Sequence, residues 1–131
     1  MTTCLDSWAI LRWLNGVEPA FSAVDSVLDD TVHDERPVMS WVNVGEVFYI
    51  TWRSEGPERA DEITRALGSS LRLDLATPER VLAAARIKAE HPMALADAFA
   101  VATAKAFDAR LLTGDPEIID TPLGLDVWDL R

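Results

Sequence analysis

The sequence has few of the residues on which several protein classes depend. Its 131 residues include one cysteine, Cys4, so a disulfide scaffold is excluded. Lys and Arg number 12 against 22 Asp and Glu, which gives a formal net charge of −10. A chain this acidic is poorly suited to bind nucleic acid or an anionic membrane through its overall charge. A run of about 18 apolar residues is also missing, so we expect no membrane span.

What the sequence does contain is typical of a globular enzyme-sized domain. Hydrophobic residues make up 49% and charged residues 26%, which argues against intrinsic disorder. The length predicts a single domain over residues 1–131. The first residues lack the basic start and apolar run of a signal peptide, so we expect a cytoplasmic protein.

Short apolar runs alternate with longer segments of helical periodicity. This alternation predicts an α/β three-layer sandwich around a parallel sheet of about five strands. Strands are expected at residues 2–5, 38–41, 71–75 and 109–113, with a last one around Leu125 and Val127; helices are expected at 8–14, 20–28, 43–53, 58–67, 77–90 and 95–107, and a polar loop at 33–37.

Two acids follow predicted strands directly. Asp6 comes after the first strand, and Asp115 comes after the strand at 109–113. Ligands of open parallel sheets collect outside the carboxyl ends of the strands, where the strand order reverses. If these two strands are neighbours at such a point, both acids face the same crevice.

Two further acids lie within apolar helices. Glu46 sits between Val44 and Val47, where an unpaired buried carboxylate would cost several kcal/mol. Asp97 lies in the first turn of an alanine-rich helix. Four carboxylates converging on one crevice repel each other, and a divalent cation would neutralise them. Carboxylate oxygens suit Mg²⁺ or Mn²⁺, which predicts metal-assisted hydrolysis of a phosphodiester.

The segments that carry these acids resemble the PIN-domain family, and within it the VapC-type toxins of toxin–antitoxin pairs. The resembling segments are Cys4-Leu5-Asp6-Ser7, Asn43-Val44-Gly45-Glu46-Val47, Ala96-Asp97-Ala98-Phe99-Ala100-Val101-Ala102 and Leu112-Thr113-Gly114-Asp115-Pro116-Glu117. The resemblance implies a five-stranded parallel sheet and a Mg²⁺- or Mn²⁺-dependent ribonuclease. Its four metal-binding and catalytic acids would be Asp6, Glu46, Asp97 and Asp115. It also implies an RNA substrate, a cognate antitoxin whose C-terminal segment lies in an apolar groove near the acids, and a homodimer.

Four polar residues are expected to support these acids. The resemblance assigns this role to Ser7, Thr113 and Glu117, as hydrogen-bonding partners or as a further acid. Asn43 lies one helical turn before Glu46, so the two can share a face. The chain departs from the family pattern at Trp8, where a small or aliphatic residue is usual, and at Ala94, where a hydroxyl residue often caps the helix.

Each acid also has an ordinary structural interpretation. Asp6 can cap a helix, Asp97 can favour the positive end of one, Asp115 can belong to a turn, and Glu46 can face solvent. Two other functions stay open: a receiver-like phosphoacceptor module, and a PIN domain that binds RNA or a partner without cutting. Receivers usually carry adjacent acids after the first strand and a lysine after the last, whereas here Leu5 precedes Asp6 and residues 125–131 contain no lysine.

Overall fold

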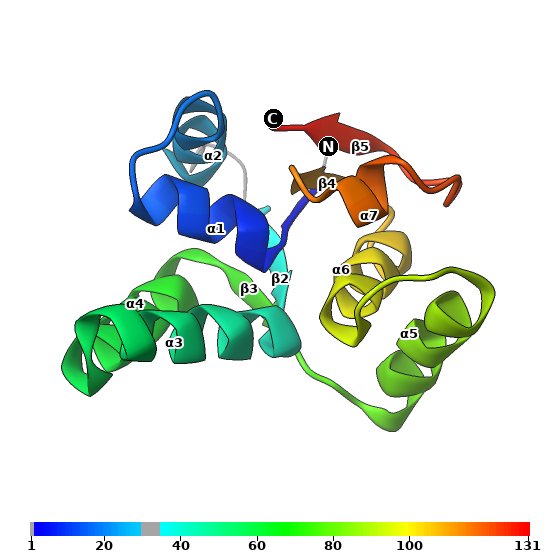
Figure 1. Cartoon of the computed structure of the whole chain (residues 1–131), viewed down its shortest axis with the longest axis horizontal. Helices are drawn as coiled ribbons and strands as arrows, with labels where there is room; N and C mark the ends of the chain where they lie inside the picture. The colour runs from blue at the N-terminus through cyan, green and yellow to red at the C-terminus, as the bar shows by residue number, and fades with distance from the viewer. Residues whose placement is uncertain (1, 30–34) are drawn as a thin grey trace.

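Five parallel strands form one sheet in the part of the chain that the computed structural model describes, residues 2–29 and 35–131 (Figure 1). The strands are β1 (Thr3–Leu5), β2 (Val38–Ser40), β3 (Arg72–Asp74), β4 (Arg110–Thr113) and β5 (Val127–Asp129). They lie in the order β3-β2-β1-β4-β5, and every neighbouring pair is parallel. The expected α/β architecture with about five parallel strands is therefore confirmed.

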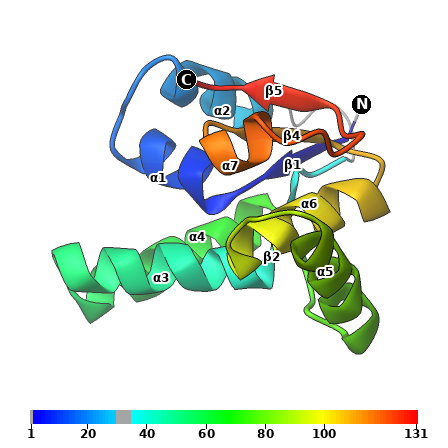
Figure 2. The ribbon, with the colours of Figure 1, turned by 45° about the vertical axis from the view of Figure 1, so that its right-hand side comes forward.

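Helices cover both faces of this sheet (Figures 1 and 2). In chain order they are α1 (Ser7–Leu14), α2 (Ala20–Asp29), α3 (Trp41–Glu55), α4 (Pro57–Ser70), α5 (Pro78–Glu90), α6 (Leu95–Ala106) and α7 (Pro116–Ile119). Among the described residues, none of these helices is long and apolar enough to cross a membrane.

The strands divide their side chains between two hydrophobic cores. Cys4 and Leu111 pair in register and pack with residues of α5 and α6 on one face. The next pair, Leu5 and Leu112, packs with residues of α1 to α4 on the other face. Because side chains of a strand alternate between faces, this period of two produces the three layers.

The strand order places the carboxyl ends of β1 and β4 side by side. Leu5 pairs with Leu112, so Asp6 and Thr113 follow at the same edge. The chain passes from β1 to β2 and β3 on one side of β1 and then crosses to β4 and β5 on the other side, which is the reversal expected for a ligand site. Receiver modules order their strands 2-1-3-4-5, so the receiver-like alternative is wrong.

Two local predictions need correction, and one lies partly outside the described residues. Trp41 was expected to end a strand, but it begins α3, because the side chain of Ser40 accepts a hydrogen bond from the Val42 N–H and caps the helix there. The helix α7 was missed, although Asp115 followed by Pro116 is a typical start of a helix. Residues 33 and 34 of the expected polar loop at 33–37 lie outside the described residues.

The buried side chain of Leu5 provides a test of this packing. Leu5 is 0% exposed at the centre of the sheet, whereas Leu75 is 65% exposed. We expect Leu5→Ala to lower the free energy of unfolding by about 2–5 kcal/mol, because it leaves a cavity. Leu75→Ala should change it by less than about 0.5 kcal/mol. Urea denaturation measures both, and equal effects would contradict the packing described.

Candidate active site

Asp6 joins the first helix to the neighbouring strand. Its carboxylate caps α1 by accepting a hydrogen bond from the Ala9 N–H at 2.8 Å. The other carboxylate oxygen accepts a hydrogen bond from the Thr113 hydroxyl at the end of β4. Asp6 is only 2% exposed. The capping interpretation of Asp6 is thus correct, and the same carboxylate also ties β1 to β4.

The hydroxyl of Thr113 also contacts Asp115. Its hydroxyl oxygen accepts a hydrogen bond from the Asp115 N–H at 3.0 Å. Asp115 in turn caps α7, and its carboxylate accepts from the Glu117 N–H at 2.9 Å. Asp6, Thr113, Asp115 and Glu117 therefore form one continuous series of contacts at the edge of the sheet.

Glu46 is held by hydrogen-bond donors from two elements. Its carboxylate accepts from the Ser7 hydroxyl at 2.8 Å and from the Asn43 side-chain amide at 3.1 Å. The same Asn43 nitrogen donates to the Ala96 carbonyl at 3.1 Å, directly before Asp97. One amide therefore links the third helix to the start of α6.

Three acids form the tightest cluster. One carboxylate oxygen from each of Asp97, Asp115 and Glu117 lies within 4.8 Å of the others. Asp6 and Glu46 lie outside this group of three and are connected to it by the contacts above. Glu117, expected as a supporting residue or as a further acid, is thus among those best placed to hold a cation. It also accepts a hydrogen bond from the Ala94 N–H at 3.2 Å, at the helix start that lacks a capping hydroxyl.

The proximity of these acids changes their ionisation. Burial raises the pKa of Asp6 to about 7, aided by the negative charges of Asp115 and Glu46 and opposed by the hydrogen bonds from Thr113 and Ala9. Burial also raises the pKa of Asp97 to about 8, together with the charge of Asp115 and contacts with Glu117. The carboxyl groups of Asp6 and Asp97 therefore hold their protons more strongly than an exposed aspartic acid does.

The donors present fit a hard divalent cation. All three clustered side chains offer carboxylate oxygens, the ligands that Mg²⁺ and Mn²⁺ prefer, whereas zinc sites usually contain Cys or His. Within the described part of the chain, the Oδ1 atom of Asn43 is buried and has no hydrogen-bond partner. An uncompensated polar atom beside mutually repelling acids indicates a site shaped for an additional charged group.

Two features of the site were not predicted from the sequence. The indole of Trp8 lies against Gly114, between Thr113 and Asp115, and the guanidinium of Arg12 lies over the same indole, 4.7 Å from the ring centre. The close placement of Glu117 also depends on α7. Its signal was the Asp115-Pro116 pair, whereas the Trp8 contact connects positions more than 100 residues apart and has no local signal.

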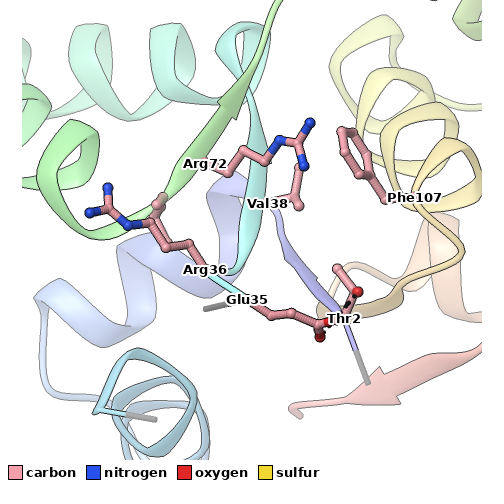
Figure 3. Close-up of a pocket in the computed structure, with 7 residues that line it drawn as sticks. Thr2, Glu35, Arg36, Val38, Arg72 and Phe107 are labelled. Atoms are coloured by element: carbon pink, nitrogen blue, oxygen red, sulfur yellow. Dashed lines mark hydrogen bonds between the residues drawn. The ribbon is translucent and has the colours of Figure 1, made fainter. Parts of the chain in front are cut away.

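A separate pocket lies at the opposite end of the strands. It has a volume of about 340 Å³ and is lined by Thr2, Glu35, Arg36, Val38, Leu71, Arg72 and Phe107. Figure 3 shows the Thr2 hydroxyl donating to Glu35 and the Arg72 side chain extending toward Phe107. The guanidinium carbon of Arg72 lies 4.7 Å from the centre of the Phe107 ring. Val38 and Arg72 begin their strands, so this pocket is not part of the acidic edge.

Comparison with solved structures supports the fold assignment. A toxin–antitoxin complex from Klebsiella pneumoniae aligns with a TM-score of 0.75 and 17% identity, covering 99% of this chain and 98% of the other. VapBC from Salmonella typhimurium bound to DNA aligns with a TM-score of 0.76 and 18% identity, covering 100% and 99%. VapC20 from Mycobacterium tuberculosis, described as a toxin that cleaves the sarcin–ricin loop, aligns with a TM-score of 0.71 and 14% identity, covering 91% and 94%.

At these identities the structural likeness establishes the fold only. No curated protein matches the sequence significantly. A family model for the PIN domain, however, matches residues 3–122. This match spans both strands at the acidic edge and all the acids described above. The chain therefore belongs to the PIN-domain family.

Proposed function

We propose that this chain is a Mg²⁺- or Mn²⁺-dependent endoribonuclease that acts as the toxin of a toxin–antitoxin pair. The observation that carries the proposal is the cluster of Asp97, Asp115 and Glu117 oxygens at the carboxyl edge of β4. The match to the PIN family and the fold shared with VapC20, described as a toxin that cleaves the sarcin–ricin loop, support the same conclusion.

The residues around such a site would have different roles. Asp97, Asp115 and Glu117 offer oxygens to the cation, and Asp6 adds negative charge from its buried position. Ser7 and Asn43 fix the direction of the Glu46 carboxylate, as residues around a metal site generally do. When bound, Mg²⁺ or Mn²⁺ would offset the charge of the acids and the scissile phosphate and acidify a nearby water.

This arrangement also explains how an acidic chain can act on RNA. With a net charge of −10, the protein repels a polyanion in bulk. Neutralising the carboxylate cluster removes the repulsion at the position where phosphate must approach. We therefore expect affinity for RNA to depend on the cation and on few local contacts.

We further propose a cognate antitoxin as partner, a homodimer and a cytoplasmic location. The antitoxin is supported by similar structures that are toxin–antitoxin complexes. An apolar groove of about 230 Å³ between α1, α2 and α4 offers such a partner a surface; it is lined by Trp13, Leu14, Leu28, Arg59, Glu62, Ile63, Ala66, Leu67 and Ser70. Trp13 and Leu14 lie at the opposite end of α1 from Asp6, so an antitoxin segment seated there would need to extend along α1 to cover the acids.

The first test is metal-dependent cleavage. Purified protein should cut structured RNA in Mg²⁺ or Mn²⁺ and lose this activity in EDTA. Asp97→Asn should reduce the rate by at least about 100-fold, because a group close to the chemistry is lost. Asp61→Asn, a matched change on the exposed surface of α4, should leave the rate unchanged. Cleavage in EDTA, or equal rates for the two variants, would refute the proposal.

The second test concerns Thr113, whose hydroxyl connects Asp6 to Asp115. Thr113→Val should weaken Mn²⁺ binding by about 10–100-fold, as losses of supporting residues at metal sites do. Its control is Thr64→Val on α4, where the hydroxyl donates only to the Ala60 carbonyl. Electron paramagnetic resonance of free Mn²⁺ reports the affinity without relying on activity. Unchanged affinity in Thr113→Val would show that this connection does not shape the site.

The third test uses pH. The pKa values of Asp6 and Asp97 are raised to about 7 and about 8 in the folded chain. Between about pH 4 and these values, both side chains keep protons in the folded chain that they lose in the unfolded chain. These two groups should therefore make the metal-free protein less stable as the pH rises from about 5 to about 8. Once it is ionised in the folded chain, a fully buried acid lowers the free energy of unfolding by about 1.4 kcal/mol for each unit by which its pKa is raised.

Urea denaturation in EDTA at several pH values measures this slope. Asp6→Asn should reduce the slope, because its side chain cannot ionise, and added Mn²⁺ should reduce it in the native chain by favouring the ionised acids. Stability that rises from pH 5 to pH 8 would contradict the ionisation described.

A further inference from the structure

Gly114 has no room for a side chain. A Cβ atom at this position would lie 2.2 Å from Cζ2 and Cη2 of Trp8 and 2.6 Å from Cε2, closer than real Cβ contacts. The glycines with positive φ in the described chain are Gly16, Gly56 and Gly124, so backbone conformation does not require glycine here. Glycine is required at this position because the Trp8 indole occupies the space that a side chain would need.

Trp8 belongs to a short segment that contacts three other parts of the site. Asp6 contacts Thr113, Ser7 contacts Glu46, and Trp8 contacts Gly114. These consecutive residues form the cap and first turn of α1, whose geometry is fixed by the hydrogen bond from Ala9 to Asp6. The cap and first turn of α1 therefore contact the segments that carry Glu46 and Asp115.

The turn that carries Asp115 is held by hydrogen bonds from the Leu130 N–H to the Thr113 carbonyl and from the Glu117 N–H to the Asp115 carboxylate, and Trp8 adds a packing contact at Gly114. Helix α7 is only four residues long, and Ile118 is its buried residue. The Asp115 N–H bonds to Thr113, but the path of the chain between these residues passes through Gly114. A displacement of about 1 Å in a catalytic group can cost about 100-fold in rate. The indole thus lies against the backbone that leads directly into Asp115.

The indole itself is held by Arg12, one turn further along α1. Its guanidinium lies over the ring at 4.7 Å from the centroid, a favourable cation–π distance. Within residues 2–29 and 35–131, Arg12 forms no ion pair, so its described interaction is with the ring. Gly114 and Arg12 together restrict where the ring can lie.

We propose that Trp8 is a positioning residue of the acidic site and that Trp8 and Gly114 act as a pair. The indole holds the turn between β4 and α7 so that Asp115 meets Asp97 and Glu117 at a spacing that suits a divalent cation. The proposal rests on the metal-binding part of the proposed function. It assigns a role to the position at which the chain departs from the family pattern.

The experiment compares Gly114→Ala, Trp8→Ala and the double variant, with Mn²⁺ alone as the probe. Gly114→Ala should weaken Mn²⁺ binding by about 10–100-fold, because the new methyl group displaces the turn. Trp8→Ala should weaken binding by about 10-fold, since it frees the turn without a clash. In the Trp8→Ala background, Gly114→Ala should cause no further loss, so the double variant should bind better than Gly114→Ala alone.

A matched control separates this effect from a general cost of replacing glycine. Gly68→Ala on α4 places its Cβ 4.0 Å from Leu73, an ordinary contact, and should not alter Mn²⁺ binding. If Gly114→Ala does not fold, equal affinities of the double variant and Trp8→Ala still support the pair. A further loss in the double variant, or normal binding by Gly114→Ala, would overturn it.

A second readout does not depend on metal. In metal-free protein, the backbone amide NMR signals of Asp115 and Glu117 should shift in Gly114→Ala and return toward those of Trp8→Ala in the double variant. If the native chain binds no Mn²⁺, the proposed function fails, and these shifts decide the positioning role independently. Amide signals that do not respond to Gly114→Ala would reject that role.

Discussion

Mutual repulsion between carboxylates is the constraint on which the acidic edge depends. Every acid brought there must be offset by a donor, a proton or a cation, because an uncompensated buried charge is costly. The structure meets this requirement with donors from neighbouring segments. Thr113 and the Ala9 N–H hold Asp6, while Ser7 and Asn43 hold Glu46. The residues that offset the charge are also the ones that join the strands and helices around the site.

Helix capping and metal binding are compatible roles in this fold. Asp6 caps α1, Asp115 caps α7, and Asp97 lies in the first turn of α6. In a parallel sheet the helices that follow strands begin at the carboxyl edge, where ligands also bind. The partial positive charge of helix starts favours acids there. A capping acid at this edge is therefore already placed to face a cation, and for these three acids the ordinary interpretation is compatible with the functional one.

Much of the fold could be predicted because its signals are local. Alternating apolar residues and Pro or Gly breaks indicated the strands and most helices, and acids after two strands indicated the shared edge. The boundary at Ser40 and Trp41 was wrong because one hydroxyl cap outweighed the apolar pattern. The pairing of Trp8 with Gly114 could not be predicted, since it depends on how α1 packs beside β4. A single sequence shows which residue types are present but not which distant ones fill the same space.

The raised pKa values of Asp6 and Asp97 show how the repulsion between the acids is compensated. Without a cation, the edge relieves its repulsion by keeping protons near neutral pH. A divalent cation offers a stronger compensation, and its binding must release those protons. On the proposed function, the stability lost by gathering the acids would be recovered when a cation binds. Proteins commonly retain such local destabilisation where function requires it, and here it coincides with the edge of the sheet that we propose as the active site.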